Sequence, residues 1–310
     1  MKYRQVGKSG LKVSEISIGG WLTFGSSVHD ETAHDILALA VERGINFIDV
    51  ADIYAKGESE RVVGEFIKDL DRTKLVISSK TYWPMSQDVN DRGLSRKHIM
   101  ESVEKSLKRL NTDYLDIYFC HRFDDDTPLD ETLRAMDDLV RQGKILYWGT
   151  SMWSDTQLQD AHTLASKYNA YAPTVEQPRY NLIHREIESG VLPKASELGM
   201  GLVVWSPLAQ GLLTGKYDNG IPEGSRAANS NWLEGDLTDA NIAASRKFTQ
   251  IAGDLGVKPS QLALAWCLTH DTVSSVITGA SSRAQLEENL AATEIELDTE
   301  TLSTLDTLFT

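Results

Sequence analysis

Cysteine is scarce in this sequence. The 310 residues include only Cys120 and Cys267, which lie far apart and outside any CxxC pattern. This arrangement indicates neither a disulfide framework nor a zinc site built from cysteines. Two isolated cysteines favour a protein from a reducing compartment.

Long apolar runs and an excess of positive charge are also missing. No apolar stretch approaches the roughly 20 residues that span a bilayer, and residues 1–13 lack the apolar centre of a signal peptide. Asp and Glu number 45 against 31 Lys and Arg, which gives a formal net charge of −14. That charge disfavours nucleic acid and anionic lipid, because both present phosphate. We therefore expect a cytoplasmic protein without nucleic-acid or membrane partners.

Short apolar runs rich in β-branched residues recur along the chain. They lie at residues 16–18, 46–50, 75–79, 114–120, 145–149, 173–176, 202–205 and 273–278. Amphipathic stretches with apolar spacings of three and four lie between them, at 31–43, 58–68, 95–110, 130–142, 155–167 and 185–198. Apolar strands that alternate with helices predict a covered parallel sheet, and eight such units in about 250 residues are typical of a (β/α)8 TIM barrel.

A doubly wound sheet is the alternative fold. Such a sheet usually has a glycine-rich phosphate turn after its first strand, but Gly19 and Gly20 do not complete GxGxxG. We expect residues 1–310 to form one barrel domain with an N-terminal β-hairpin, an extra helix after the seventh strand at 239–255, and a C-terminal helix at 299–309. The irregular stretch 222–239 is long enough to suggest a functional loop.

Polar residues follow three successive predicted strands. Asp49 ends the second strand with Tyr54 five residues further on, Lys80 follows the third, and His121 follows the fourth. Working residues of a β/α barrel lie at these strand ends, so the four side chains are expected to converge. Each residue taken singly has a structural explanation. Asp49 could be a cap, Tyr54 a packed aromatic, Lys80 a snorkelling lysine and His121 a hydrogen-bonded loop histidine. Together they favour a site that delivers a proton.

Tyr54 is the candidate acid. A free tyrosine has a pKa near ~10 and needs a neighbouring cation to act at neutral pH. Lys80 at ~4 Å and an effective dielectric of ~20 contributes about 4 kcal/mol, or roughly three pKa units before desolvation is counted. Asp49 is expected to hold Lys80 charged, and His121 to donate a hydrogen bond to the substrate oxygen.

This set resembles the Asp, Tyr, Lys, His tetrad of the aldo-keto reductases. The similarity extends over essentially the whole chain, through motifs at 44–54, 94–99, 109–116, 147–151, 205–217, 279–281 and 285–289. Within that family the chain is most similar to the branch that contains the β subunits of voltage-gated potassium channels and bacterial glyceraldehyde-phosphate reductases.

The resemblance implies catalysis by Asp49, Tyr54, Lys80 and His121 and an extended NADPH or NADP⁺ across the barrel mouth. The implied cofactor residues are Gly20, Trp21, Asp49, Ser151, Gln177, Trp205, Ser206, Leu208, Gly211, Lys216, Arg226, Gly279, Ser281, Gln285, Glu288 and Asn289. A preference for NADPH follows from a 2′-phosphate expected beside Ser281 and Gln285, with Arg283 close in sequence and the start of the helix 283–291 suited to anions. Met152 departs from the polar or basic residue common after the Ser151 match.

Aromatic residues suggest the substrate pocket. Trp21, Tyr54, Trp83 and His121 are the candidate substrate contacts, and Tyr82, Phe123 and Trp153 also follow strand ends. A small aldehyde or ketone fits such a pocket. The acidic residues 124–126 are interpreted as a solvated loop, since no histidine spacing supports a metal.

Two functions remain open. One is NADPH-dependent reduction of small aldehydes or ketones, and the other is an NADPH-binding, redox-sensing regulatory subunit with slow turnover. The chain begins only a few residues before the barrel, and His121 stands where the channel subunits, by resemblance, carry asparagine. Both observations favour the enzyme, whereas a metal-dependent isomerase lacks ligands. The assemblies of the branch suggest a homo-oligomer.

Overall fold

A two-stranded hairpin closes the end of the barrel at which the strands begin. The computed structural model describes residues 1–229 and 233–309, and it begins with β1 (Tyr3–Gln5) and β2 (Lys12–Ser14), which pair antiparallel. Val6 and Val13 of the hairpin region are fully buried against Phe47, Ile117 and other residues that point into the barrel. The expected N-terminal hairpin is therefore present and plugs the barrel.

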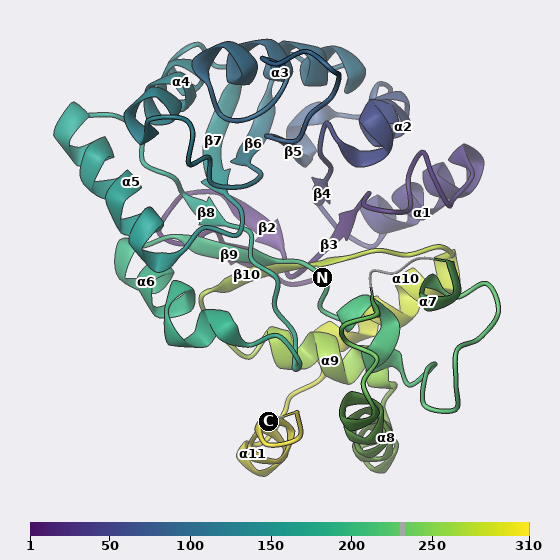
Figure 1. The fold of residues 1–310 in the computed structure, drawn as a ribbon. Helices are drawn as coiled ribbons and strands as arrows, with labels where there is room; N and C mark the ends of the chain where they lie inside the picture. Colours follow the sequence, from purple (N-terminus) through teal and green to yellow (C-terminus); the bar gives the residue numbers. More distant parts are fainter. Residues whose placement is uncertain (230–232, 310) are drawn as a thin grey trace.

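The described residues contain a closed barrel of parallel strands (Figure 1). Its strands are β3 (Ile16–Gly19), β4 (Phe47–Asp49), β5 (Val76–Thr81), β6 (Leu115–Cys120), β7 (Ile145–Thr150), β8 (Val175–Glu176), β9 (Gly201–Val204) and β10 (Val273–Thr278). Pairing of β10 with β3 closes the ring, with Val276 opposite Ile16. The predicted TIM barrel is confirmed, and the doubly wound alternative is wrong because that sheet has open edges.

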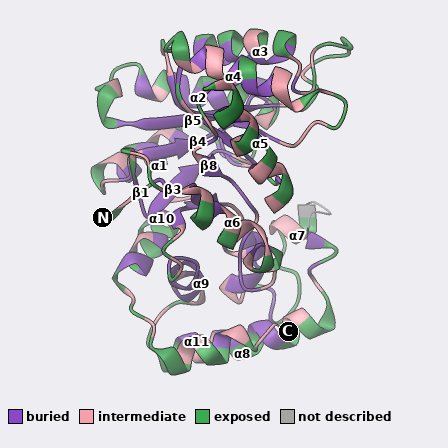
Figure 2. Ribbon diagram, turned by 90° about the vertical axis from the view of Figure 1, so that its left-hand side faces the viewer, coloured by how far each residue is buried: buried purple, intermediate pink, exposed green. Residues whose placement is uncertain are grey.

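Helices surround the barrel in chain order (Figure 1). They are α1 (Asp30–Glu42), α2 (Glu58–Ile67), α3 (Arg96–Arg109), α4 (Leu129–Arg141), α5 (Asp155–Tyr168), α6 (Val191–Leu198), α9 (Pro259–Cys267) and α10 (Arg283–Leu290). Ser154 caps α5 through a reciprocal pair of hydrogen bonds with Gln157, which satisfies two free N–H groups. Figure 2 shows buried strands at the centre and exposed outer faces on the helices.

The helix predicted at 185–198 is wrong as one element. A 3-10 turn, η3 (Glu186–Ser189), precedes Gly190, and α6 begins only at Val191. Gly190 has φ −141° and ψ −73°, outside the helical region, so the helical hydrogen bonds are interrupted there. Glycine permits this break because it has the lowest helix propensity after proline.

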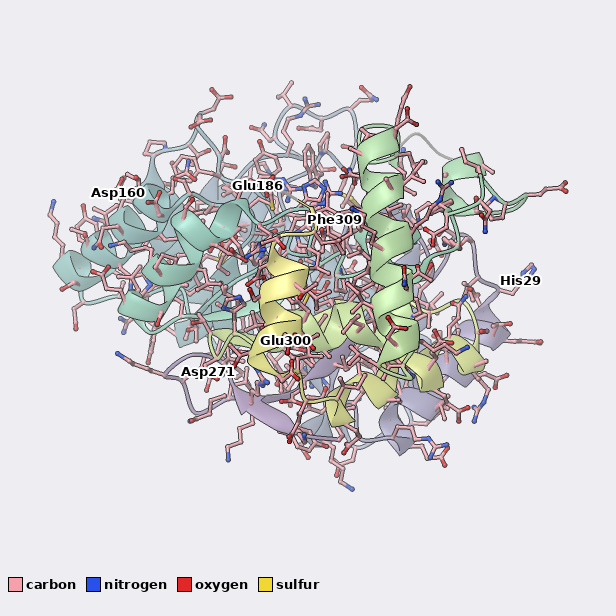
Figure 3. All side chains as sticks on the ribbon, turned by 90° about the horizontal axis from the view of Figure 1, so that it is seen from below. His29, Asp160, Glu186, Asp271, Glu300 and Phe309 are labelled. Carbon is pink, nitrogen blue, oxygen red and sulfur yellow. The ribbon has the colours of Figure 1, made fainter. Side chains whose placement is uncertain are left out.

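Two further helices lie outside the eight units. The first is α8 (Asp239–Asp254), which follows β9, and the second is α11 (Thr299–Asp306), near the C-terminus. Figure 3 shows them side by side, and the rings of Phe248 and Phe309 lie 6.3 Å apart. Both predicted additions are therefore present. The stretch predicted to be irregular contains a short α7 (Arg226–Asn229), and its residues 230–232 lie outside the described residues.

Smaller turns complete the chain. They are η1 (Tyr54–Gly57), η2 (Arg72–Lys74), η4 (Ala209–Thr214) and η6 (Ala291–Glu294). Among the helices described, none combines the length and apolar character needed to cross a bilayer.

Candidate active site

Strand alternation decides which side chains enter the barrel. Along β5, Val76 packs in the inner cluster and Ile77 in the cluster beneath the helices. A period of two therefore directs Ser78 and Lys80 inward. The same alternation along β4 places Phe47 in the inner cluster and Ile48 in the cluster beneath the helices, so Asp49 points into the barrel.

Asp49, Lys80 and Tyr54 form a continuous chain of hydrogen bonds. The Lys80 Nζ donates to Asp49 Oδ2 at 2.6 Å, to the Val50 carbonyl at 2.8 Å and to the Tyr54 hydroxyl at 3.1 Å. Ser78 also donates to Asp49, at 2.6 Å. The ammonium group thus has three acceptors, which compensates for its complete burial.

Tyr54 lies on a loop with an unusual backbone. Ala55 and Lys56 have φ of 48° and 52°, and Gly57 has φ of 94°. A Cβ on Gly57 would lie 2.8 Å from Arg109 Cδ, so this close approach requires glycine. Asp52, at the start of the loop, accepts a hydrogen bond from Ser102 of α3. The helix layer therefore supports the loop that carries the tyrosine.

Burial and nearby charge set the pKa values of the site. Burial raises the pKa of Tyr54 above its ordinary value, although Lys80 opposes this rise. Burial alone would lower the pKa of Lys80, but Asp49 and Tyr54 raise it on balance. Burial, together with the positive charges of Lys80 and Arg122, lowers the pKa of His121 well below its usual range. At neutral pH the site holds a protonated tyrosine, a charged lysine and an uncharged imidazole.

His121 lies beside Tyr54 at the end of β6. Their ring centroids are 5.8 Å apart, and the His121 Nδ1 is buried without a hydrogen-bond partner among the described residues. The Trp83 ring lies 6.3 Å from His121 and is 37% exposed. A polar ligand atom between these side chains would satisfy the free nitrogen.

The other aromatic candidates divide into two groups. Trp21 and Trp205 make an edge contact at 6.0 Å, and both are partly exposed. Trp153 instead is buried in the core, 4.8 Å from the Phe123 ring. Trp153 is therefore a packing residue, which corrects its place in the suggested pocket wall.

Gln177 connects the next strands to this site. Its Nε2 donates to Asp49 Oδ1 at 3.0 Å, and Ser151 donates to its carbonyl at 2.9 Å. Both residues are buried and follow β8 and β7. Met152, with φ of 59°, is 44% exposed, and its sulfur accepts from the Arg179 N–H. The Met152 side chain thus lies toward Arg179.

The loop after β9 has the shape of an anion site. Ser206, Ala209, Gln210 and Gly211 all have positive φ, a feature of turns that bind phosphate. The N–H groups of Ala209 and Gly211 donate to the Ser206 and Leu208 carbonyls within the loop. A Cβ on Gly211 would lie 2.4 Å from Lys216 Nζ, so the ammonium group rests over the loop. No described carboxylate lies within 4.0 Å of Lys216, so its charge is available to an anionic ligand. Leu208 directly precedes the 3-10 turn η4.

Arg226 and Gly20 lie around the same mouth. The Arg226 guanidinium is 5.9 Å from the Trp21 ring centroid. A Cβ on Gly20 would lie 2.3 Å from Ser59 Oγ, so packing against α2 requires glycine there. Gly20 also donates its N–H to the Asp49 carbonyl.

The candidates for the adenosine end lie after β10. Gln285 Oε1 accepts from both the Ser281 N–H and hydroxyl, at 2.9 and 3.0 Å. Glu288 accepts from Ser260 of α9, and Arg283 donates to the Asp35 carbonyl of α1. A Cβ on Gly279 would lie 3.7 Å from Thr23 Cγ2, an ordinary contact, and Asn289 is buried. Ser281 and Gln285 thus pair with each other, while Arg283 and Glu288 contact neighbouring helices.

Metal ligands are not clustered in the part of the chain that is described. No group of three or more His, Cys, Asp or Glu side chains there is arranged to hold an ion. In the acidic loop 124–126, the Asp124 carboxylate accepts hydrogen bonds from the Leu94 N–H and the Thr127 hydroxyl. Sequence reasoning missed Arg122, which borders the site; its position directly after a strand-end histidine was the available signal.

The chain is similar to known proteins over nearly its whole length. The model of the aldo/keto reductase family matches residues 15–309. Similar relatives include a probable voltage-gated potassium channel subunit beta from rice (Oryza sativa subsp. japonica) and another from Arabidopsis thaliana. Each is 44% identical over 302 residues, covering 95% of this chain and 92% of the relative. A putative subunit of the same kind from Schizosaccharomyces pombe is 44% identical over 316 residues, covering 98% and 92%.

Proposed function

This chain belongs to the aldo/keto reductase family, and on that premise we propose that it reduces small aldehydes or ketones to alcohols with NADPH. The observation that supports the proposal most directly is the chain of hydrogen bonds from Asp49 through Lys80 to Tyr54, with the free Nδ1 of His121 beside it. A proton donor, a cation that fixes its geometry and a second polar group converge on one point.

Tyr54 supplies the proton. Bound NADPH would supply the hydride for the carbonyl carbon, and the Tyr54 hydroxyl would give its proton to the carbonyl oxygen. Because burial raises the pKa of Tyr54, the hydroxyl stays protonated at neutral pH and is ready for reduction. Lys80 stabilises the tyrosinate left behind, and Asp49 keeps Lys80 oriented.

His121 positions the carbonyl. Its low pKa keeps the imidazole uncharged, so it acts as a hydrogen-bond donor without competing with Tyr54 as the acid. Trp83 borders the space beside it, and Trp21, which contacts Trp205 at the mouth, would also limit the size of the substrate. The substrate class is accordingly a small aldehyde or ketone.

The cofactor would lie across the mouth of the barrel. Trp205 would pack against the nicotinamide ring, and Ser151 and Gln177 would hold its carboxamide. Ser206, Leu208, Gly211 and Lys216 would bind the diphosphate, with Arg226 beside them. Gly279, Ser281, Gln285, Glu288 and Asn289 would border the adenosine; Glu288 must leave Ser260 to contact it.

A panel of aldehydes and ketones tests the proposal. We expect aldehyde-dependent loss of NADPH absorbance, with one alcohol formed for each NADPH consumed. The same enzyme should form NADPH from NADP⁺ and the product alcohol. Tight NADPH binding without carbonyl-dependent turnover would contradict the enzyme function.

The names of the relatives support a second candidate, a subunit of a potassium channel. In that case the chain would bind NADPH as a redox sensor and turn over slowly. The imidazole of His121 beside Tyr54 favours catalysis. Turnover numbers across the panel distinguish the two functions, since a sensor would stay slow with every carbonyl.

A further inference from the structure

Arg122 is a cation beside the site that has no carboxylate partner. It directly follows His121 at the end of β6, and its Nη1 donates to the His121 main-chain oxygen. Among residues 1–229 and 233–309, no carboxylate oxygen lies within 4.0 Å of its guanidinium. One acceptor leaves most of its five donors free.

Four other partly buried arginines of the chain have a carboxylate partner. Arg4, Arg72, Arg109 and Arg179 each have a carboxylate oxygen between 2.5 and 2.7 Å away. Acidic residues are abundant, so the lack of a partner at Arg122 does not follow from composition. A partly desolvated guanidinium is costly unless an anion meets it.

The guanidinium is placed to reach a substrate. Its Cζ lies 5.5 Å from the Trp83 ring centroid, and Trp83 in turn lies next to His121. The positive charge of Arg122 opposes the rise that burial causes in the pKa of Tyr54, and it adds to the lowering that burial causes in the pKa of His121. Arg122 therefore borders the space where the carbonyl group of the substrate would lie.

The neighbouring acidic loop does not neutralise Arg122. The Asp124 carboxylate accepts from the Leu94 N–H and the Thr127 hydroxyl, at 2.7 Å each. Glu176 is close enough to act on Arg122 but is fully buried, and it accepts from Thr150 at 2.5 Å. Burial raises the pKa of Glu176 to about 7, so much of it is uncharged near neutral pH.

We propose that Arg122 determines substrate specificity by binding an anionic group, so that the preferred substrates are small aldehydes or ketones carrying a carboxylate or a phosphate. This inference rests on the proposed reductase function. Tyr54 and His121 contact the carbonyl oxygen, and Arg122 holds the charged end of the same molecule. The planar guanidinium suits two-point binding of either anion.

Matched substrates test the inference. We compare kcat/KM for 4-oxobutanoate with that for its methyl ester, and for glycolaldehyde phosphate with that for glycolaldehyde. The wild-type protein should prefer at least one anion over its neutral partner by about 10-fold or more. The first pair reports on carboxylate and the second on phosphate, so the preferred anion is identified.

Variants assign the preference to Arg122. Arg122→Gln should reduce the anion-to-neutral ratio by about 10- to 100-fold, as expected for a lost charge-assisted hydrogen bond. Arg122→Lys should retain part of the preference for the anionic substrate. Arg134→Gln is the matched control, because it removes the same charge from the outer face of α4, where the side chain is 58% exposed. The ratio should be unchanged there.

Three outcomes would overturn the inference: neither anion is preferred by the wild type, Arg122→Gln keeps the ratio, or Arg134→Gln lowers it equally. If Arg122→Gln does not fold, the wild-type ratios and the Arg122→Lys variant still decide. Reduction of the neutral aldehydes shows separately whether the reductase function holds. If no aldehyde is reduced, calorimetry of the NADP⁺ complex with 4-hydroxybutanoate and with 2-hydroxyethyl phosphate still decides, because at least one must bind to the wild type and lose binding in Arg122→Gln.

Discussion

Tyr54 and Lys80 show how burial and charge compete at a single residue. The sequence predicted that Lys80 would bring the tyrosine toward a neutral pKa. In the structure the 3.1 Å contact is present, yet burial outweighs the lysine and raises the pKa of Tyr54. Sequence alone could not weigh the two, because desolvation depends on how strands and helices surround the hydroxyl. A protonated tyrosine favours carbonyl reduction at neutral pH.

Replacing Tyr54 by Phe should lower kcat by about 10²- to 10⁴-fold, since only the proton donor is removed. The dissociation constant for NADPH, measured by fluorescence titration, should stay close to that of the wild type. An unchanged rate in a step limited by chemistry would show that another group is the acid.

Replacing Lys80 by Met should shift the pH dependence of alcohol oxidation. Oxidation needs the tyrosinate, so its rate rises with pH toward the pKa of Tyr54. Lys80 lowers that pKa, and its loss should move the rise to higher pH and lower the rate at neutral pH.

The pH profile of kcat for oxidation checks this shift. Lys74→Met serves as the control, because it removes an equal charge from a side chain that is 79% exposed. Coincident profiles for wild type and Lys80→Met would contradict the role of Lys80.

The strand elements were largely predictable, whereas their ends and partners were not. Apolar runs with β-branched residues gave the barrel strands, because a covered parallel sheet buries both faces of each strand. The break at Gly190 was missed because the apolar spacing continues across it. The partners of Gln285 and Glu288 depend on the positions of Ser281 and Ser260, which spacing does not specify.

The contact between the Tyr54 loop and α3 should carry a pH-dependent contribution to stability. Burial and the nearby Glu60 raise the pKa of Asp52 to about 8. The unfolded carboxyl releases its proton near pH ~4, so the folded state binds one more proton between these values. The free energy of unfolding therefore falls as pH rises through this window.

Asp52→Asn should remove that slope, because the amide resembles the neutral acid and does not titrate. Urea unfolding between pH 5 and pH 8 should show the variant gaining stability relative to wild type as pH rises. Asp69→Asn, at an exposed position after α2, should follow the wild type. Parallel curves for Asp52→Asn and wild type would contradict a raised pKa at Asp52.

The whole molecule presents a closed barrel whose mouth gathers the working residues, while the net charge is −14. Such a charge opposes a cofactor with an extra phosphate unless local cations and N–H groups offset it. The expected homo-oligomer and cytoplasmic location stay predictions. The fold and the family were predictable, because long motifs follow one another in the expected order. The hydrogen bond from Arg283 to the Asp35 carbonyl was not predictable from the sequence.

We expect kcat/KM to be higher with NADPH than with NADH, because the N–H groups at the start of α10 and the Ser281 hydroxyl can donate hydrogen bonds to the 2′-phosphate. The margin should be modest, since Gln285 is uncharged and Arg283 is directed toward α1. One aldehyde assayed with both cofactors measures this preference. Equal values, or a preference for NADH, would contradict it, and Arg283→Ala should weaken NADPH alone if its side chain turns to the phosphate.

Direct transfer of deuterium tests the central claim of carbonyl reduction by hydride transfer. NADPH labelled with deuterium at the transferring position is mixed with the protein and the best aldehyde of the panel, and the alcohol is analysed by mass spectrometry. Hydride transfer to the carbonyl carbon predicts one deuterium on the carbinol carbon for each NADPH consumed, at a rate that falls sharply in Tyr54→Phe. An alcohol without deuterium, or NADPH that stays unconsumed with every carbonyl, would contradict it.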